Sequence, residues 1–262
     1  MTDVLSLNRQ AWNNQSNDAT SPWVQPSDRD TIERARRDDW QVILTPCKAV
    51  PREWFGNLGD KHVLGLASGG GQQVPILAAA GAHVTSFDNS DAQLARDAEV
   101  AEREGLDIRL QQGDMADLSR FADASFDLIF HPVSNVYAED IVPVWRECHR
   151  VLKQGGRLLA GFMNPCFYLF DHEGLERGEP MEIRYSLPFS DLEELDPSRI
   201  QERVARGEGV EFSHSLDTQI GAQLQAGFVL AGFYEDRWED SATPLNRYMP
   251  TSMATLAIKA DA

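Results

Sequence analysis

The sequence has few cysteines, and their arrangement excludes two kinds of architecture. Among 262 residues there are only three, Cys47, Cys148 and Cys166. They are scattered and odd in number, with no C-x-x-C spacing, so neither a disulfide framework nor a zinc site is expected. We predict reduced thiols, most of them buried. The six histidines form no H-x-x-x-H or H-E-x-x-H pattern, so no metal site is predicted.

Long apolar runs are absent, and basic residues are few. No stretch approaches the ~20 apolar residues of a membrane span, and Met1–Arg9 has neither region of a signal peptide. We therefore expect a cytoplasmic protein without a membrane partner. Its 24 basic and 41 acidic residues give a net charge of −17. Such a surface repels phosphate backbones, so nucleic acid is not an expected partner. No sequence feature indicates the oligomeric state.

What the sequence does contain is a regular alternation of short apolar runs and helical patterns over residues 61–164. Strands that alternate with helices indicate βαβ units and a parallel sheet with right-handed crossovers. The predicted strands are His62–Ala67, His83–Phe87, Ile108–Gln111, Phe126–Phe130 and Arg157–Phe162, and the helices between them are Val74–Ala80, Ser90–Glu104 and Val142–Leu152.

Two segments beside this core have a different character. Residues 1–60 predict an N-terminal helical cap with short helices at Leu5–Trp12 and Arg29–Trp40, separated by two prolines. Residues 165–209 are rich in proline, glycine and charge, and a β-like run, Met181–Pro188, precedes a polar helix. We interpret residues 165–209 as a lid or insertion.

The C-terminal segment, residues 210–262, is predicted to complete the core sheet within a single domain. A helix is expected at Leu216–Ala226, followed by strands at Phe228–Tyr234 and Met253–Lys259. Because no helical pattern separates these two strands, they are expected to form an antiparallel hairpin at the sheet edge.

The strongest local signal is the glycine-rich turn within Val63–Gln73, V-L-G-L-A-S-G-G-G-Q-Q, where a strand runs into a helix. Glycines allow the backbone to approach a ligand closely, and a helix start presents free amide N–H groups. This pattern alone fits several nucleotide-type cofactors. Asp88 ends the second predicted strand, where a carboxylate can accept hydrogen bonds from both hydroxyls of a ribose. An acid at this place can also cap the following helix.

Three further motifs follow in order. G-D-M-A-D-L, Gly113–Leu118, comes after the third predicted strand, S-F-D-L-I-F-H, Ser125–His131, spans the fourth, and R-V-L-K-Q-G-G-R-L, Arg150–Leu158, leads into the fifth. With these motifs in this order, the sequence resembles the class I S-adenosylmethionine-dependent methyltransferases, in particular the small-molecule type called methyltransferase type 11. The resemblance covers about residues 60–165, and the edge hairpin near 228–259 adds to it.

The resemblance implies a fold, a cofactor and an activity. The fold is a Rossmann-like α/β sheet of seven strands, mostly parallel with an antiparallel last strand and helices on both faces. The cofactor is S-adenosylmethionine. The activity is methyl transfer to a small molecule, which the sequence does not identify.

The resemblance also implies which residues contact each part of the cofactor. The implied contacts are Ala67, Ser68, Gly69 and Gly71 for the methionine part, Asp88 for the ribose, Asp114 and Met115 for the adenine, and His131 for the sulfonium or the substrate, and Asn89 and Gly113 are also expected to bind the cofactor.

At two positions the sequence departs from the family pattern. Related enzymes usually have an acidic residue where Gly65 stands and a glycine where Ala67 stands. The acid helps to fix the turn and the amino group of the cofactor. We therefore expect another group, either the backbone near Ala67 or the exit of the fourth strand, to hold that ammonium.

Candidates for catalysis follow the fourth strand and precede the last helix. His131 and Asn135, in H-P-V-S-N, are at the carboxyl end of a strand, where ligands of α/β sheets bind. They are a candidate base and a candidate orienting group, or else they belong to a hydrogen-bonded loop. His214 is a further candidate, with a packing role as its alternative. A base is needed only if the acceptor must lose a proton.

Aromatic residues supply candidates for substrate contact. Trp12 and Trp23 could close over a flat or apolar substrate, whereas Trp40 and Trp54 are predicted to pack the N-terminal segment onto the sheet. Tyr168, together with Asn164, follows the fifth predicted strand, and both are candidate substrate contacts.

Two other functions compete with methyl transfer. A nicotinamide-dependent oxidoreductase shares the glycine turn and the strand-end acid, but Val74 occupies the third glycine position of G-x-G-x-x-G and Pro75 follows it. A non-catalytic module that binds S-adenosylmethionine or its demethylated product would have the same motifs. An accessible polar cleft beneath the lid would favour an enzyme, and a cleft filled by lid side chains would favour the binding module.

Overall fold

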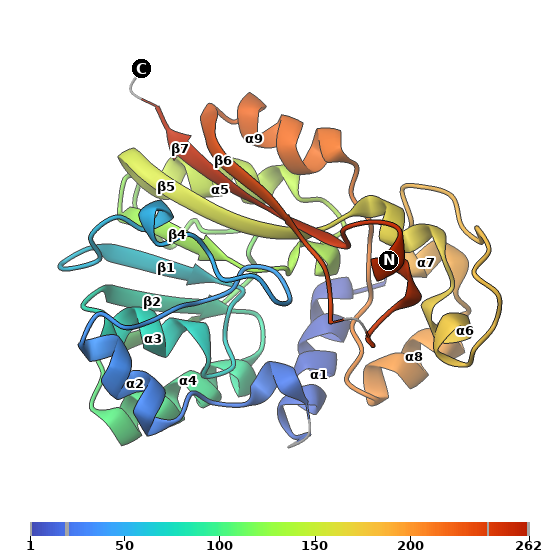
Figure 1. Cartoon of the computed structure of the whole chain (residues 1–262), viewed down its shortest axis with the longest axis horizontal. Coiled ribbons are helices and arrows are strands. Elements are labelled where there is room, and N and C mark those ends of the chain that lie inside the picture. Colours follow the sequence, from blue (N-terminus) through green and yellow to red (C-terminus); the bar gives the residue numbers. More distant parts are fainter. Residues whose placement is uncertain (1, 19–20, 240, 261–262) are drawn as a thin grey trace.

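The structure is a computed structural model, and it describes residues 2–18, 21–239 and 241–260. A seven-stranded sheet forms the centre of the protein (Figure 1). The strand order is β3-β2-β1-β4-β5-β7-β6. The first five strands pair in parallel, and β7 runs antiparallel to both β5 and β6. This arrangement confirms the predicted fold. The strands are β1 (His62–Leu66), β2 (His83–Asp88), β3 (Ile108–Gln112), β4 (Phe126–His131), β5 (Leu152–Met163), β6 (Phe228–Asp236) and β7 (Ser252–Lys259).

Helices cover both faces of the sheet, because successive strand residues point to opposite sides. In β1, Val63 packs into the cluster beneath one set of helices and Leu64 into the cluster beneath the other. The first set contains α2 (Arg29–Arg36), α3 (Gln73–Ala79) and α4 (Asp91–Glu104), and the second contains α5 (Val142–Val151) and α9 (Ala222–Gln225).

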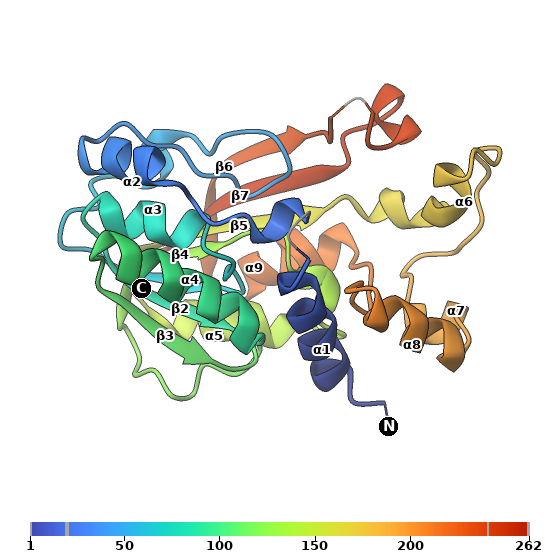
Figure 2. The ribbon, with the colours of Figure 1, turned by 90° about the horizontal axis from the view of Figure 1, so that it is seen from below.

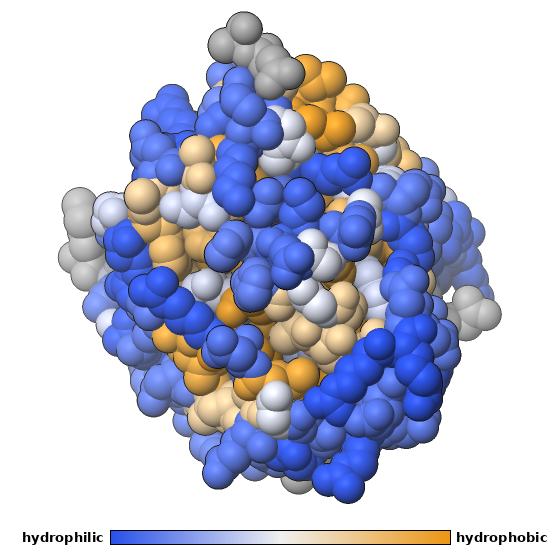
Figure 3. Space-filling model, turned by 90° about the vertical axis from the view of Figure 1, so that its left-hand side faces the viewer, coloured by the Kyte–Doolittle hydropathy of each residue, from blue (hydrophilic) through white to orange (hydrophobic). Residues whose placement is uncertain are grey.

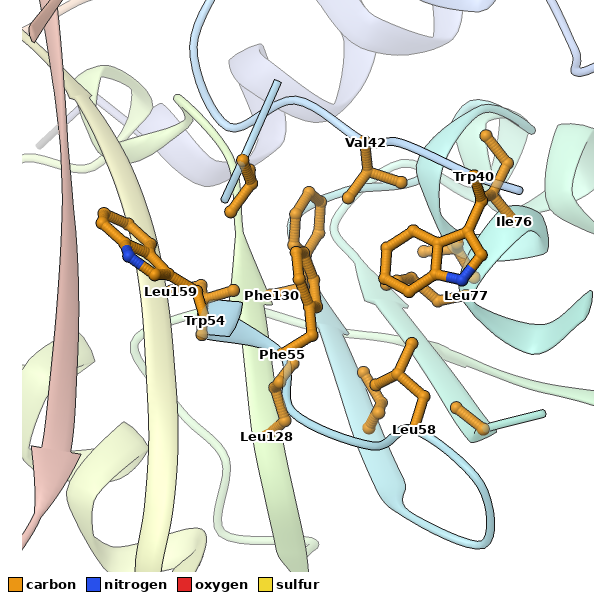
Figure 4. Close-up of a cluster of buried hydrophobic side chains, with 14 of the residues drawn as sticks. Trp40, Val42, Trp54, Phe55, Leu58, Ile76, Leu77, Leu128, Phe130 and Leu159 are labelled. Atoms are coloured by element: carbon orange, nitrogen blue, oxygen red, sulfur yellow. The ribbon is translucent and has the colours of Figure 1, made fainter. Parts of the chain in front are cut away.

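Aromatic side chains fasten the N-terminal segment to the sheet (Figure 4). Trp40 and Trp54 are buried in the same cluster as Phe130 of β4. The Phe55 ring is edge-on to Trp40, with centroids 5.0 Å apart, and stacks on Phe130 at 6.3 Å. The predicted packing role of Trp40 and Trp54 is confirmed. Figure 3 shows the end of the molecule away from the lid, where mostly hydrophilic residues surround apolar patches.

The first helix, α1 (Val4–Ser16), is longer than predicted and does not lie on the sheet. Its N-terminus is capped by Asp3, which accepts a hydrogen bond from the Ser6 amide. The helix lies against α8 (Pro197–Ala205) and α4, beyond the carboxyl ends of the strands (Figure 2). The Asn8 side chain donates to the carbonyl of Val210, so α1 is joined to the segment that follows the lid.

Residues 165–209, the predicted lid or insertion, contain short helices and no strand, and we use the word lid as a name for this segment. The β-like run predicted at Met181–Pro188 is wrong, because this segment pairs with no strand of the sheet. Pro188 has no amide to donate, Ile183 is 74% exposed, and the Arg184 and Tyr185 amides both donate to the Leu169 carbonyl instead of to a strand. The lid helices are η4 (Pro165–Leu169), α6 (His172–Glu176), α7 (Asp191–Glu194) and α8.

Two other expectations need correction. The helix predicted at Leu216–Ala226 begins as a π-helical turn, η5 (Asp217–Gly221), before α9. The cysteines are free, but only Cys148 is buried, because it alone is on a helix face against the sheet. The remaining 3₁₀ helices are η1 (Pro22–Val24), η2 (Arg52–Trp54), η3 (Asn135–Tyr137) and η6 (Pro244–Arg247).

Candidate functional site

A cavity of about 630 Å³ opens at the carboxyl ends of the parallel strands, between the sheet, α1 and the lid. This is where parallel α/β sheets bind ligands. Eight of the ten predicted cofactor contacts line it, and Gly71 and His131 do not. The eight are Ala67, Ser68, Gly69, Asp88, Asn89, Gly113, Asp114 and Met115.

Backbone amides of the glycine turn form hydrogen bonds within the protein. The Gly69 amide donates to Oδ2 of Asp88 at 3.0 Å, and the Gly71 amide donates to Oδ1 of Asp97 at 2.8 Å. The Ala67 amide donates to a carbonyl of β2. The expectation that this turn presents free amides is therefore wrong at these three residues. Their hydrogen bonds fix the shape of the cavity wall instead.

Packing leaves little room for a side chain at position 65. A Cβ atom there would be 2.6 Å from Cγ2 of Val74 and 2.7 Å from Oγ of Ser68, so a larger residue fits only if these side chains move. Ser68 is one of the cavity-lining residues, but its Oγ is itself buried and has no hydrogen-bond partner among the described residues. This oxygen lies toward Gly65, so it is not exposed to a ligand in the cavity.

Asp88 combines two backbone bonds with a place in the cavity wall. Its Oδ1 accepts from the Ser90 amide at 2.9 Å, and its Oδ2 accepts from Gly69. Burial raises the pKa of this carboxyl group. The next residue, Asn89, is engaged with α1, because it accepts from Nε of Arg9 at 3.1 Å and donates to the carbonyl of Leu5 at 2.8 Å.

The third group of predicted contacts is shaped by close packing after β3. A Cβ atom at Gly113 would be 2.4 Å from Cζ of Phe87, so only glycine fits beside this ring. Oδ1 of Asp114 accepts from the Ala116 amide at 2.9 Å, and its Oδ2 accepts from no described residue. Asp114 and Met115 both line the cavity, which leaves Oδ2 as an acceptor for a ligand.

His131 is fully buried and lies behind the cavity wall. Its Nδ1 donates to the Leu66 carbonyl at 3.0 Å, and its Nε2 lies 2.8 Å from Oδ1 of the Asn135 side chain. Burial lowers the pKa of the imidazole. The Asn135 side chain in turn donates from Nδ2 to Oε1 of Gln219 at 2.9 Å. Both ring nitrogens are thus occupied by the protein.

His214 joins the same buried network. Its Nε2 donates to the carbonyls of Asn135 and Ala138, at 3.1 and 2.9 Å. The structure therefore brings the three catalytic candidates together, but none of them lines the cavity. What they hold is the loop after β4, whose residues Pro132, Val133 and Ser134 do line it.

The side of the cavity toward the lid contains residues that the sequence analysis missed. Tyr168, a candidate from the sequence, donates from its hydroxyl to Oε2 of Glu211 at 2.8 Å. No motif singled out Glu211, since it lies in a segment without periodicity. Asn164 does not line the cavity, because it caps η4 and binds the Pro250 carbonyl. We call Met163, Phe167, Tyr168, Arg203 and Glu211 the lid end of the cavity.

Aromatic residues from the N-terminal segment close the remaining sides. Trp12 lies edge-on to Tyr137, with ring centroids 5.3 Å apart, and Trp23 lies edge-on to Trp238 at 5.5 Å. All four line the cavity. The described residues include no group of three or more histidine, cysteine or acidic side chains that could hold a metal ion. Among the helices of the described ranges, none has the length and apolarity to cross a membrane.

Comparison with known proteins finds relatives over the whole chain. A family model described as a methyltransferase domain matches residues 64–160. The uncharacterized methyltransferase YbaJ of Bacillus subtilis is 43% identical over 259 residues, which is 99% of this chain and 100% of that protein.

Solved structures share the fold. An S-adenosylmethionine-dependent methyltransferase from Mesorhizobium loti has a TM-score of 0.60 and 22% identity, covering 79% of this chain and 94% of that one. Geranyl diphosphate C-methyltransferase from Streptomyces coelicolor, solved with Mg²⁺, geranyl diphosphate and S-adenosylhomocysteine, has a TM-score of 0.62 and 15% identity over 99% of each chain.

Proposed function

The chain belongs to the S-adenosylmethionine-dependent methyltransferases, and from that premise we propose that its methyl acceptor is a small molecule bound at the lid end of the cavity. One observation carries this proposal. A single cavity extends from Asp88 and Asp114 to Tyr168 and Glu211, so two ligands can meet in it. The bound cofactor supplies an electrophilic methyl group.

The residues at the strand ends fit the parts of the cofactor. Asp88 would accept from the ribose hydroxyls, with Asn89 beside it, and Asp114 would accept from the adenine amino group at its unused Oδ2. The remaining assignments are Gly113 and Met115 against the adenine ring, and Ala67, Ser68 and Gly69 against the methionine part. The last assignment is supported by the place of all three residues in the cavity lining.

His131, Asn135 and His214 would position the loop after β4 rather than transfer a proton. Their polar atoms bind one another and backbone carbonyls, and none lines the cavity. Gly71 has a comparable role, because its amide fixes the turn through Asp97. Holding both reactants in the correct geometry can supply about 7–11 kcal/mol of a transfer barrier, so catalysis does not require a base from this network.

The open cavity supports an enzyme over a binding module. Lid side chains border the cavity without filling it, since about 630 Å³ remains. The net charge of −17 supports a small molecule over nucleic acid as acceptor. The free, exposed thiols of Cys47 and Cys166 suit a reducing compartment, so we propose the cytoplasm.

The test is a search for product with a labelled methyl group. The purified protein is incubated with S-adenosylmethionine bearing a trideuterated methyl group and with fractionated small molecules, and the products are read by mass spectrometry. We expect a labelled small molecule that depends on the protein and is lost in Asp88→Ala. Tight binding of S-adenosylhomocysteine without labelling of any fraction would favour the binding module.

A further inference from the structure

Glu211 is an acidic residue at the lid end of the cavity. Its one side-chain hydrogen bond comes from the Tyr168 hydroxyl, 2.8 Å from Oε2. Arg203 is the base whose charge acts on it, but the Arg203 guanidinium is paired with Asp191 at 2.9 Å and with Glu208 at 3.1 Å. Glu211 itself forms no ion pair with any described residue.

A carboxylate withdrawn from water without a counter-ion is costly. Desolvation by burial raises the pKa of Glu211 and outweighs the opposing positive charge of Arg203 and the hydrogen bond from Tyr168, while the negative charge of Asp191 adds to the rise. Asp191, a structural acid in this region, offsets the free energy of burying its charge by pairing with an arginine. A buried acid that has no such pair and lines a cavity is characteristic of a ligand site.

Aromatic rings line the same cavity as Glu211. Tyr168 packs edge-on against Phe167, with centroids 5.5 Å apart, and Tyr137 packs against Trp12. All four rings line the cavity. The faces of aromatic rings carry partial negative charge and attract cations. A carboxylate and several rings in one recess therefore match a cationic group on an apolar body.

We infer that the lid end of the cavity binds the positively charged amino group of the methyl acceptor, with Glu211 as its counter-ion and the rings of Tyr137 and Tyr168 beside it. Naming this amine as the acceptor rests on the proposed function. An acceptor with a carboxylate or phosphate at this end would meet Glu211 with the same sign of charge and is disfavoured.

The test compares two probes of nearly equal shape, phenethylamine and its neutral counterpart 2-phenylethanol. Each is titrated calorimetrically into the protein at pH 8, with and without saturating S-adenosylhomocysteine. We expect the parent protein to bind the amine about tenfold more tightly than the alcohol, and Glu211→Gln to bind both equally. Glu194→Gln, the same change at an exposed acid on α7, should keep the preference of the parent.

Several results would overturn the inference. These are equal binding of amine and alcohol to the parent, binding of neither, survival of the preference in Glu211→Gln, or its loss in Glu194→Gln. Parent-like affinity of Glu211→Gln for S-adenosylhomocysteine shows that the variant is folded, and the parent titrations decide the question even if it is not. An amine preference without any binding of S-adenosylhomocysteine would instead overturn the proposed function and leave the amine site standing.

Discussion

Asp97 accepts a hydrogen bond from the Gly71 amide, 2.8 Å from Oδ1, and so ties α4 to the glycine turn. Its Oδ2 accepts from the Ser86 hydroxyl at 2.6 Å, which adds β2 to the same contact. The carboxyl group is fully buried, and desolvation raises its pKa to about 7. One acid thus connects α4, the glycine turn and β2 beside the strand-end wall of the cavity.

The raised pKa of Asp97 predicts a pH dependence of stability. Between 3.8 and about 7 the folded protein binds a proton at Asp97 that the unfolded chain has released. The free energy of unfolding should therefore fall as pH rises through this window and stay level above it. Asp97→Asn, a neutral isostere, should lose this contribution. Urea unfolding of parent and variant at pH 5 and pH 8 measures the difference, and parallel pH profiles would refute it.

Removing the Asp97 side chain altogether should be harmful at every pH. Asp97→Ala leaves the Gly71 amide and the Ser86 hydroxyl buried without partners, at a cost of about 1–3 kcal/mol each. We expect a loss of about 2–4 kcal/mol in the free energy of unfolding and a weaker cofactor complex. If the Ala and Asn variants unfold at the same urea concentration, these two hydrogen bonds do not hold the turn.

Asp88 and His131 should differ sharply in their effect on cofactor affinity. Asp88→Ala removes the acceptor proposed for the ribose, and charge-assisted hydrogen bonds contribute about 1.5–3 kcal/mol each. We expect affinity for S-adenosylhomocysteine to fall roughly 100-fold in equilibrium dialysis. His131→Ala should lower thermal stability but leave affinity within about threefold, because His131 is buried in a hydrogen-bond network and does not line the cavity. Equal affinity of Asp88→Ala and the parent would remove the ribose assignment.

Restoring the usual acid at position 65 should not improve this protein. Gly65→Asp forces a side chain against Val74 and Ser68, whose atoms would be 2.6 and 2.7 Å from its Cβ. Overpacking of this kind typically costs about 1–3 kcal/mol. Scanning calorimetry should show a lower melting temperature than for Gly59→Ala, where the new Cβ approaches only Asn57, at 3.3 Å. A variant as stable as the parent would show that the turn can adapt.

The sequence predicted the sheet and eight residues that line the cavity, because both depend on local patterns. The alternation of strands and helices, the glycine turn and Asp88 at a strand end are all readable from neighbours along the chain. Glu211 could not be predicted because its place in the site depends on a hydrogen bond from Tyr168, which is 43 residues away in the sequence. His131 and His214 were candidates because of their residue type and position, but the hydrogen bonds that hold their rings are made to residues distant in the sequence and could not be predicted.

The contact between Trp23 and Trp238 predicts an effect on ligand exchange. The two rings meet edge-on at 5.5 Å and both line the cavity, joining the N-terminal segment to the segment after β6. An aromatic pair contributes about 0.5–1.5 kcal/mol. Trp238→Ala should therefore speed the dissociation of S-adenosylhomocysteine roughly threefold to tenfold in stopped-flow displacement. An unchanged rate would show that this contact does not close the cavity.

The central claim, that the cavity at the strand ends is built for an adenosyl sulfur compound, is tested most directly by calorimetric titration of the parent protein. S-adenosylmethionine, S-adenosylhomocysteine and NAD are titrated under the same conditions. The account predicts saturable binding of both adenosyl sulfur compounds at one site per chain and no binding of NAD. Binding of NAD, or of none of the three, would contradict it.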